Sequence, residues 1–246
     1  MDTLGVVKKC PAGCTAIAAA QMLFYLHSTY GVPATSPNSG ICTGYVYNNT
    51  VYQNFWNYTS NTWSNMYHPR NSQDTCAALL VGDVGKKVEM QYHWNGSLAP
   101  ISTLGQKVFE PYGWNSIYTN YYDSDIIVSN LTSGNPVICL GFAENRSVGK
   151  NGHTFLIDGY KRFVTKTRFT YVWVPDVRGH ILPPLDPPVD YFVYSSPHVS
   201  YYSMNWGQQD TTSNAVWCSL SGIWQYGTLP PYSYLRQMVH SFTIMQ

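Results

Sequence analysis

Cys14 is the first residue whose type and position favour chemistry. It follows the turn sequence Pro11-Ala12-Gly13, and the stretch after it is rich in Ala, Leu, Met and Gln, which predicts a helix that begins at the cysteine. The N–H groups and the dipole at a helix N-terminus lower the pKa of a cysteine and favour the thiolate, which attacks carbonyl carbons. Taken alone, the same pattern also fits a small cysteine buried at a helix start.

His153 lies in the segment NGHTFLIDGY, residues 151–160. Gly152 leaves room there for a substrate backbone, and the residues after the histidine predict an apolar strand. A histidine at a strand start can face a cleft and act as general base and general acid. A single histidine in such a place is more often a structural residue.

Asn205 and Trp206 lie in YYSMNWGQQ, residues 201–209, at the predicted end of another strand. An Asn side-chain carbonyl can accept the Nδ1–H of an imidazole and fix its tautomer, and the neighbouring indole can shield that bond from water. By itself, Asn-Trp-Gly is no more than an ordinary strand end. The chain order Cys…His…Asn, in these three settings, is typical of papain-type peptidases.

Three segments resemble the streptopain family of bacterial papain-like cysteine peptidases: GCTAIAAAQ (13–21), GHTFLIDGY (152–160) and YYSMNWG (201–207). The family has segments of the type G-C-V-A-T-A, G-G-H-A-F-V-I-D-G and N-W-G-W-G-G at these places. Two stretches in between, LLVGDVGKKVEMQY (79–92) and SDIIVSNLTSGNPVICLGF (124–142), are similar to family segments in the same order. The resemblance runs from Cys10 to near the C-terminus.

The resemblance implies a cysteine endopeptidase that cuts protein or peptide substrates through a thioester acyl-enzyme. It makes Cys14 the nucleophile, His153 its base and acid, Asn205 the group that orients the imidazole and Trp206 its cover. It also implies a secreted bacterial protein made as a zymogen, with a signal and an N-terminal propeptide that this chain does not include. No cofactor and no metal are expected.

This sequence departs from the family pattern in three places. No Gln precedes Cys14 to donate to an oxyanion, and Gln208 stands where the family has a second Trp. An insertion at about 161–198 lengthens the chain between His153 and Asn205, and it is a lid, a substrate-selecting wall or a tolerated surface insertion. Two other functions therefore stay open: a catalytically degenerate protein- or glycan-binding module, and a cell-wall amidase.

The composition excludes several classes of protein. The chain has 246 residues and 14 Lys+Arg against 13 Asp+Glu, and a net charge of +1 creates no field that attracts nucleic acid or an anionic membrane. No run of about 18 apolar residues predicts a membrane span. Six cysteines without C-x-x-C spacing predict neither a zinc site nor a disulfide scaffold. Only 11% of the residues are charged, and the many Asn, Ser and Thr residues suit an extracytoplasmic protein.

The elements that must position these residues predict an α+β, papain-like fold of two subdomains in one domain, residues 1–246. Residues 1–135 form a mainly helical half that holds the nucleophile helix, and residues 136–246 form a mainly antiparallel β half. Helices are expected at Cys14 to about Tyr30, Gln73–Val84, Ile101–Glu110 and Ser124–Leu131. Strands are expected at 86–92, Val137–Phe142, Thr154–Ile157, Phe169–Val174, Val199–Asn205 and Ser241–Met245. Residues 32–70 are expected to be a surface excursion, and the proline-rich stretch 175–197 neither strand nor helix.

Overall fold

A computed structural model describes residues 11–31, 42–47, 50–54, 75–93, 96–143, 152–170, 190–195, 198–207, 215–219, 224–225, 232 and 234–245. Within these ranges, no helix has the length and the apolar character that crossing a membrane requires. From the expected surface excursion at 32–70, the structure describes a hairpin of β1, Cys42–Tyr47, and β2, Thr50–Asn54.

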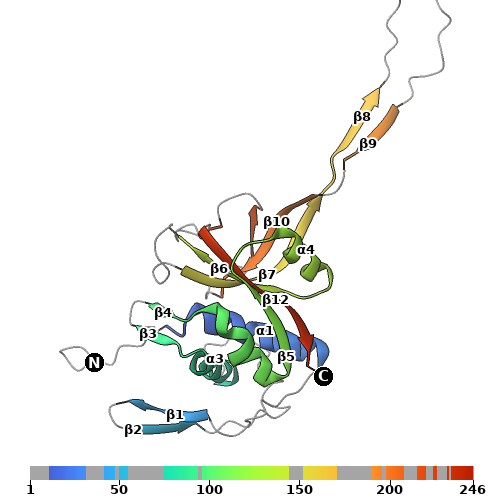
Figure 1. The fold of residues 1–246 in the computed structure, drawn as a ribbon. Helices are drawn as coiled ribbons and strands as arrows, with labels where there is room; N and C mark the ends of the chain where they lie inside the picture. The colour runs from blue at the N-terminus through green and yellow to red at the C-terminus, as the bar shows by residue number, and fades with distance from the viewer. Residues whose placement is uncertain are drawn as a thin grey trace, which may run out of the picture.

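Six antiparallel strands form the central sheet, in the order β11-β10-β7-β6-β12-β5 (Figure 1). Their bounds are β5 Trp114–Thr119, β6 Val137–Phe142, β7 Gly152–Phe163, β10 His198–Asn205, β11 Ala215–Ser219 and β12 Tyr234–Ile244. Strand β6 is buried along its whole length. Its sequence VICLGF is apolar at every position because helices cover both faces of the sheet at this strand.

Helix α1, Cys14–Tyr30, lies against one face of the sheet and contacts β7 and β6 (Figure 1). Its small buried side chains Ala16, Ala18, Ala19 and Ala20 allow the helix to approach its neighbours closely. The helix ends where Gly31 takes a left-handed conformation (φ +65°) and donates its N–H to the carbonyl of His27. Both predicted ends of this helix are confirmed.

Helix α3, Thr75–Lys87, packs on α1. The chain then continues into the hairpin of β3, Gln91–His93, and β4, Gly96–Leu98. The expected strand at 86–92 is wrong over its first half. Lys86 and Lys87 still belong to the helix, where their charges favour its C-terminal dipole, and Glu89 turns the chain with a φ of +53°. The single helix expected at 101–110 is a run of short turns: η1 Ile101–Thr103, η2 Gly105–Phe109 and η3 Glu110–Tyr112.

The alternation of side chains along β6 divides the interior into two cores. Ile138 and Leu140 face α1 and the helical part, whereas Val137 and Cys139 face helix α4, Ser124–Thr132, on the opposite side. Helix α4 and strand β5 both come from the first 135 residues, yet β5 pairs with β12 and α4 packs on β6, β7 and β12. The β part of the molecule therefore includes chain from both predicted halves.

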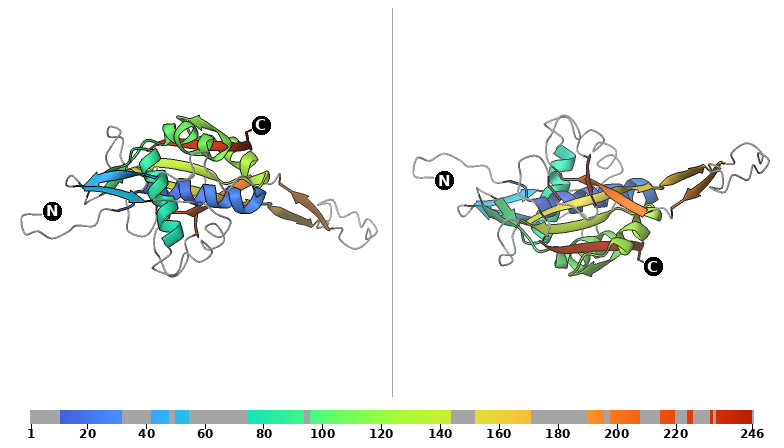
Figure 2. Two further views of the ribbon diagram at one scale, coloured as in Figure 1. Left: turned by 90° about the horizontal axis from the view of Figure 1, so that it is seen from below. Right: turned by 90° about the horizontal axis from the view of Figure 1, so that it is seen from above.

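Strands β8, Lys166–Thr170, and β9, Asp190–Tyr194, form a separate ribbon that projects from the body in every view (Figures 1 and 2). The prediction that residues 175–197 hold no strand is wrong, because residues 190–194 form β9. The hydrogen bonds of β9 come from its pairing with β8, which the local sequence does not indicate. Residues 171–189 lie outside the described part. His153 is the second residue of β7 and Phe163 the last, so about 33 Å separates them at about 3.3 Å per residue. The described ribbon therefore does not cover the start of β7 as a lid would.

Candidate active site

Cys14 is the first residue of α1, and the turn before it is held from two sides. Gly13 has a φ of +92°, and a Cβ at this position would lie 2.8 Å from the side chain of Met90. The hydroxyl of Ser97 donates to the carbonyl oxygen of Pro11 at 2.6 Å. The chain after α3 thereby fixes the start of α1, where the Cys14 N–H has no acceptor within the helix.

His153 is the second residue of β7, opposite Gly141 of β6. Its Nε2 atom lies 2.9 Å from the backbone carbonyl oxygen of Trp206, just beyond the end of β10. Because a carbonyl oxygen only accepts, Nε2 carries the hydrogen and Nδ1 is the basic nitrogen of the neutral ring. The ring is thus prepared to accept a proton at Nδ1.

Aromatic rings surround the imidazole on the sheet face that α4 covers. Trp206 stacks on it with ring centroids 5.6 Å apart and 17° between the planes, and Tyr232 and Phe155 lie at 5.3 Å and 6.1 Å. Trp206 is 1% exposed. Its buried ring therefore lies over the imidazole beside the contact at Nε2.

The expected contact between Asn205 and Nδ1 of the imidazole is replaced by another in the structure, and the imidazole nitrogen that makes it is Nε2. The Asn205 side-chain oxygen accepts from the N–H of Gly207 at 3.0 Å and from Nε2 of Gln21 at 3.4 Å. The backbone carbonyl of the next residue, Trp206, takes the place that was expected for the amide. Asn205 instead ties the end of β10 to α1 and shapes the turn that presents this carbonyl.

The environment lowers the pKa of Cys14 from 9.0 to about 7. Burial is the largest single influence and raises the pKa. It is outweighed by the hydrogen bond and the charge of His153, and further by the backbone N–H and the hydroxyl of Thr154. About half of the Cys14 side chains are therefore thiolate at pH 7.

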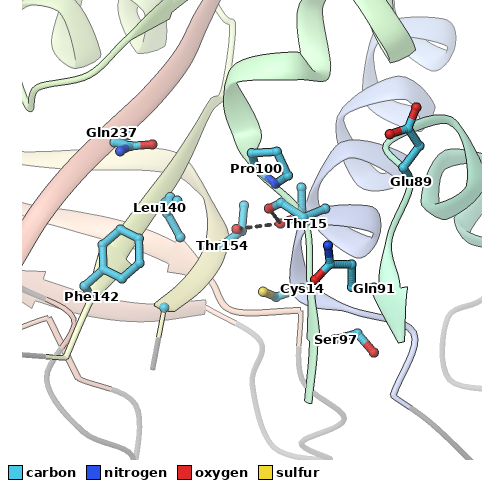
Figure 3. A pocket seen from close by; sticks show the side chains of 12 residues that line it. Cys14, Thr15, Glu89, Gln91, Ser97, Pro100, Leu140, Phe142, Thr154 and Gln237 are labelled. Carbon is cyan, nitrogen blue, oxygen red and sulfur yellow. Dashed lines mark hydrogen bonds between the residues drawn. The ribbon is translucent and has the colours of Figure 1, made fainter. Parts of the chain in front are cut away.

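A pocket of about 250 Å³ opens beside Cys14 (Figure 3). Its wall on the side of the sheet consists of Leu140, Phe142, Gly152, Thr154 and Gln237. Its wall on the side of the helical part consists of Glu89, Gln91, Ser97, Ala99 and Pro100. The sulfur of Cys14 points into the space between the two walls (Figure 3), so a group bound in the pocket lies next to the thiolate.

Sequence reasoning did not find three residues of the site: Thr15, Thr154 and Tyr232. The two threonines directly follow Cys14 and His153, and this adjacency was the available signal. Tyr232 lies in no motif, and only the fold brings its ring to the imidazole. Among the described residues, no group of three or more His, Cys, Asp and Glu side chains could hold a metal ion.

Comparisons with known proteins bear on the family and on the fold. The model of the Peptidase C10 family matches residues 2–215. Among solved structures, the chain is similar to the active wild-type interpain A cysteine protease of Prevotella intermedia, with 23% identity and a TM-score of 0.57 over 94% of this chain and 83% of that chain. A search of curated proteins found no match. The structural likeness confirms the papain-like α+β fold, and the family match shows that the chain belongs to the Peptidase C10 family, the streptopain family of cysteine peptidases.

Proposed function

We propose that the protein is a cysteine endopeptidase in which Cys14 is the nucleophile and His153 the general base and acid. The observation that carries the proposal is the pairing of a cysteine whose pKa is near 7 with an imidazole held at Nε2 by the Trp206 carbonyl. Trp206 covers the imidazole, and Asn205 positions the Trp206 turn rather than the ring itself.

The reaction begins when Nδ1 of His153 takes the proton of the Cys14 thiol. The thiolate attacks the carbonyl carbon of the scissile peptide bond, and the carbonyl electrons move onto the oxygen. The N–H of Cys14 at the helix start is suited to donate to this oxyanion. The tetrahedral intermediate then expels the amine, which takes its proton from the imidazolium, and a thioester remains on Cys14.

Water completes the cycle. Nδ1 of His153 removes a proton from a water molecule as that water attacks the thioester carbon. The second tetrahedral intermediate expels the Cys14 sulfur and releases the new carboxylic acid. The proton that His153 took from water returns to the sulfur or to solvent, so the enzyme is regenerated with both groups in their starting states.

The pocket beside Cys14 supports an endopeptidase rather than an enzyme that binds a chain terminus. An exopeptidase needs a charged group to pair with a terminal amine or carboxylate. Among the residues that line this pocket in the described structure, the charged one is Glu89, and Nζ of Lys107 lies 2.8 Å from its carboxylate. The apolar walls formed by Leu140, Phe142 and Pro100 favour the side chain of an internal substrate residue.

The proposal is tested by hydrolysis and by covalent labelling of the same protein. Wild type should cleave casein, and an epoxide inhibitor of cysteine peptidases should add once, at Cys14, as read by peptide mass spectrometry. Cys14→Ala should abolish both without a large change in melting temperature. Cys218→Ala is the matched control, because Cys218 is a buried free thiol on β11 whose pKa burial raises.

Three outcomes contradict the proposal. Folded, reduced protein that takes no epoxide would favour a binding module. Labelling of Cys14 together with release of peptides from purified peptidoglycan, but not from casein, would favour a cell-wall amidase. A large loss of stability in Cys14→Ala would indicate a buried structural cysteine.

We also propose that the enzyme works outside the cytoplasm of a bacterium and is made as a zymogen with an N-terminal propeptide. Support comes from the composition, with 11% charged residues, and from the family to which the chain belongs. The mature N-terminus and its cellular fraction, read from the source bacterium by mass spectrometry, test this proposal. An unprocessed form confined to the cytoplasm would contradict it.

A further inference from the structure

Two buried threonines directly follow the two residues of the proposed catalytic pair. Thr15 follows Cys14 on α1 and is 2% exposed, and Thr154 follows His153 on β7 and is 1% exposed. Because side chains alternate along a strand, His153 faces the aromatic side of the sheet while Thr154 faces α1. Their hydroxyl oxygens lie 3.0 Å apart, across 139 residues of sequence (Figure 3).

The hydroxyl protons of this pair can be accounted for one by one. The Thr15 hydroxyl donates to the carbonyl oxygen of Ala99 at 3.1 Å. Each hydroxyl has a single proton, so the bond between the two threonines must use the proton of Thr154. In this arrangement three segments are joined: the start of α1, the start of β7 and the residue after β4.

The Thr154 hydroxyl has a second possible acceptor. Thr154 lines the same pocket as Cys14, and Figure 3 shows the Cys14 sulfur pointing toward the wall where Thr154 stands. Both the backbone N–H and the hydroxyl of Thr154 lower the pKa of the Cys14 thiol. One hydroxyl proton therefore has two acceptors within reach, the Thr15 oxygen and the sulfur, and it can serve only one at a time.

We propose that Thr154 is a positioning residue whose hydroxyl turns from Thr15 to the Cys14 sulfur when the thiolate forms. Thr15 then turns from Ala99 and donates to the Thr154 oxygen, so that each hydroxyl keeps one donated bond. No covalent bond changes, and only the two O–H directions reverse. In both states the pair holds the His153 strand against the Cys14 helix, and in the thiolate state it adds a donor to the charged sulfur.

The other groups that face Cys14 stay the same in this change. Among the described residues, His153 on β7 and Tyr232 before β12 are titratable groups that interact with Cys14, and Glu89 after α3 lines the same pocket. Burial and the charge of Cys14 raise the pKa of Tyr232, and Glu89 is paired with Lys107 at 2.8 Å. A variant of Thr154 or Thr15 removes none of these groups, so its effect on the ionisation of Cys14 comes from the threonine.

The test is the pH dependence of alkylation of Cys14 by iodoacetamide, which forms a thioether and releases iodide. It rests on the proposed function, since it assumes that Cys14 reacts as a thiolate. Thr154→Ser keeps the hydroxyl and Thr154→Ala removes it, so these two variants form a matched pair. We expect the midpoint of the Ser variant to stay near the wild-type value of about 7. We expect the Ala variant to shift upward by about one unit, a tenfold change in the ionisation constant.

Thr15 tests the direction of the relay. In Thr15→Ala the Thr154 hydroxyl has no competing acceptor, so the midpoint should stay the same or fall, whereas Thr15→Ser should match wild type. The proposal is overturned if the Ser and Ala variants of Thr154 share one profile. It is also overturned if Thr15→Ala shifts the midpoint upward as far as Thr154→Ala, because displacement of the strand would then explain both. If Cys14 takes no label at any pH, the proposed function itself fails.

Discussion

Replacing His153 by Ala tests whether the imidazole is what makes Cys14 a thiolate at neutral pH. The two largest influences that lower the pKa of Cys14 are the hydrogen bond and the charge of His153, and burial acts in the opposite direction. Without the imidazole, we expect the pKa to return from about 7 to about its ordinary value of 9.0. The sign is upward because the substitution removes two influences that favour the thiolate, while burial still penalises it.

The size of the effect follows from two opposed terms. At pH 7 the thiolate fraction falls from about one half to about 1%, a loss of about fiftyfold. A thiolate of higher pKa is also more nucleophilic. A Brønsted coefficient of about 0.4–0.5 over two pKa units makes the thiolate form about six- to tenfold more reactive. The variant should therefore react with iodoacetamide about five- to eightfold more slowly than wild type at pH 7. Above pH 10, where both are ionised, it should react about six- to tenfold faster.

The two rate profiles should therefore cross, and the assay is the second-order rate of alkylation between pH 5 and pH 11, followed on the Cys14 peptide. His27→Ala is the matched control, because His27 lies on the same helix thirteen residues away, about 20 Å along its axis. That control should keep the wild-type midpoint. A His153→Ala profile that superimposes on wild type would refute the argument, because the low pKa would then not come from the imidazole.

Two further changes separate the roles of the residues around Trp206. Asn205→Ala should cost about 1–3 kcal/mol of unfolding free energy, because Gly207 and Gln21 lose their acceptor. The Cys14 alkylation midpoint should stay near 7, and a midpoint that rises as in His153→Ala would restore Asn205 as the group that orients the imidazole. Gly207→Ala should lower both stability and kcat/KM, because its φ is +66° and the new Cβ would lie 2.9 Å from Cγ2 of Ile17. Gly31→Ala is its control, since Gly31 has a φ of +65° with nothing within 4 Å, and equal losses in thermal denaturation and peptidase assays would contradict this reading.

Local signals in the sequence were enough for the elements that carry the site. The Ala-rich run and Gly31 predicted both ends of α1, and the apolar alternation after His153 predicted a strand there. These signals act within a few residues, so they are readable without the fold. Local signals did not reveal the strands that are stabilised by pairing with another strand. These are β9 in the proline-rich stretch, which pairs with β8, and β5 in the mainly helical half, which pairs with β12.

The sequence by itself determined which residue types stand at the helix start, the strand start and the strand end, and therefore the family and its reaction class. Tertiary structure alone decided which atoms meet. The acceptor for Nε2 of His153 is a backbone carbonyl at Trp206, and every residue has such a carbonyl, so no side-chain pattern can mark it. The bond between Thr15 and Thr154 likewise depends on how β7 packs against α1. Residues far apart in the chain meet only through strand register and packing, which set the distances on which proton transfer depends.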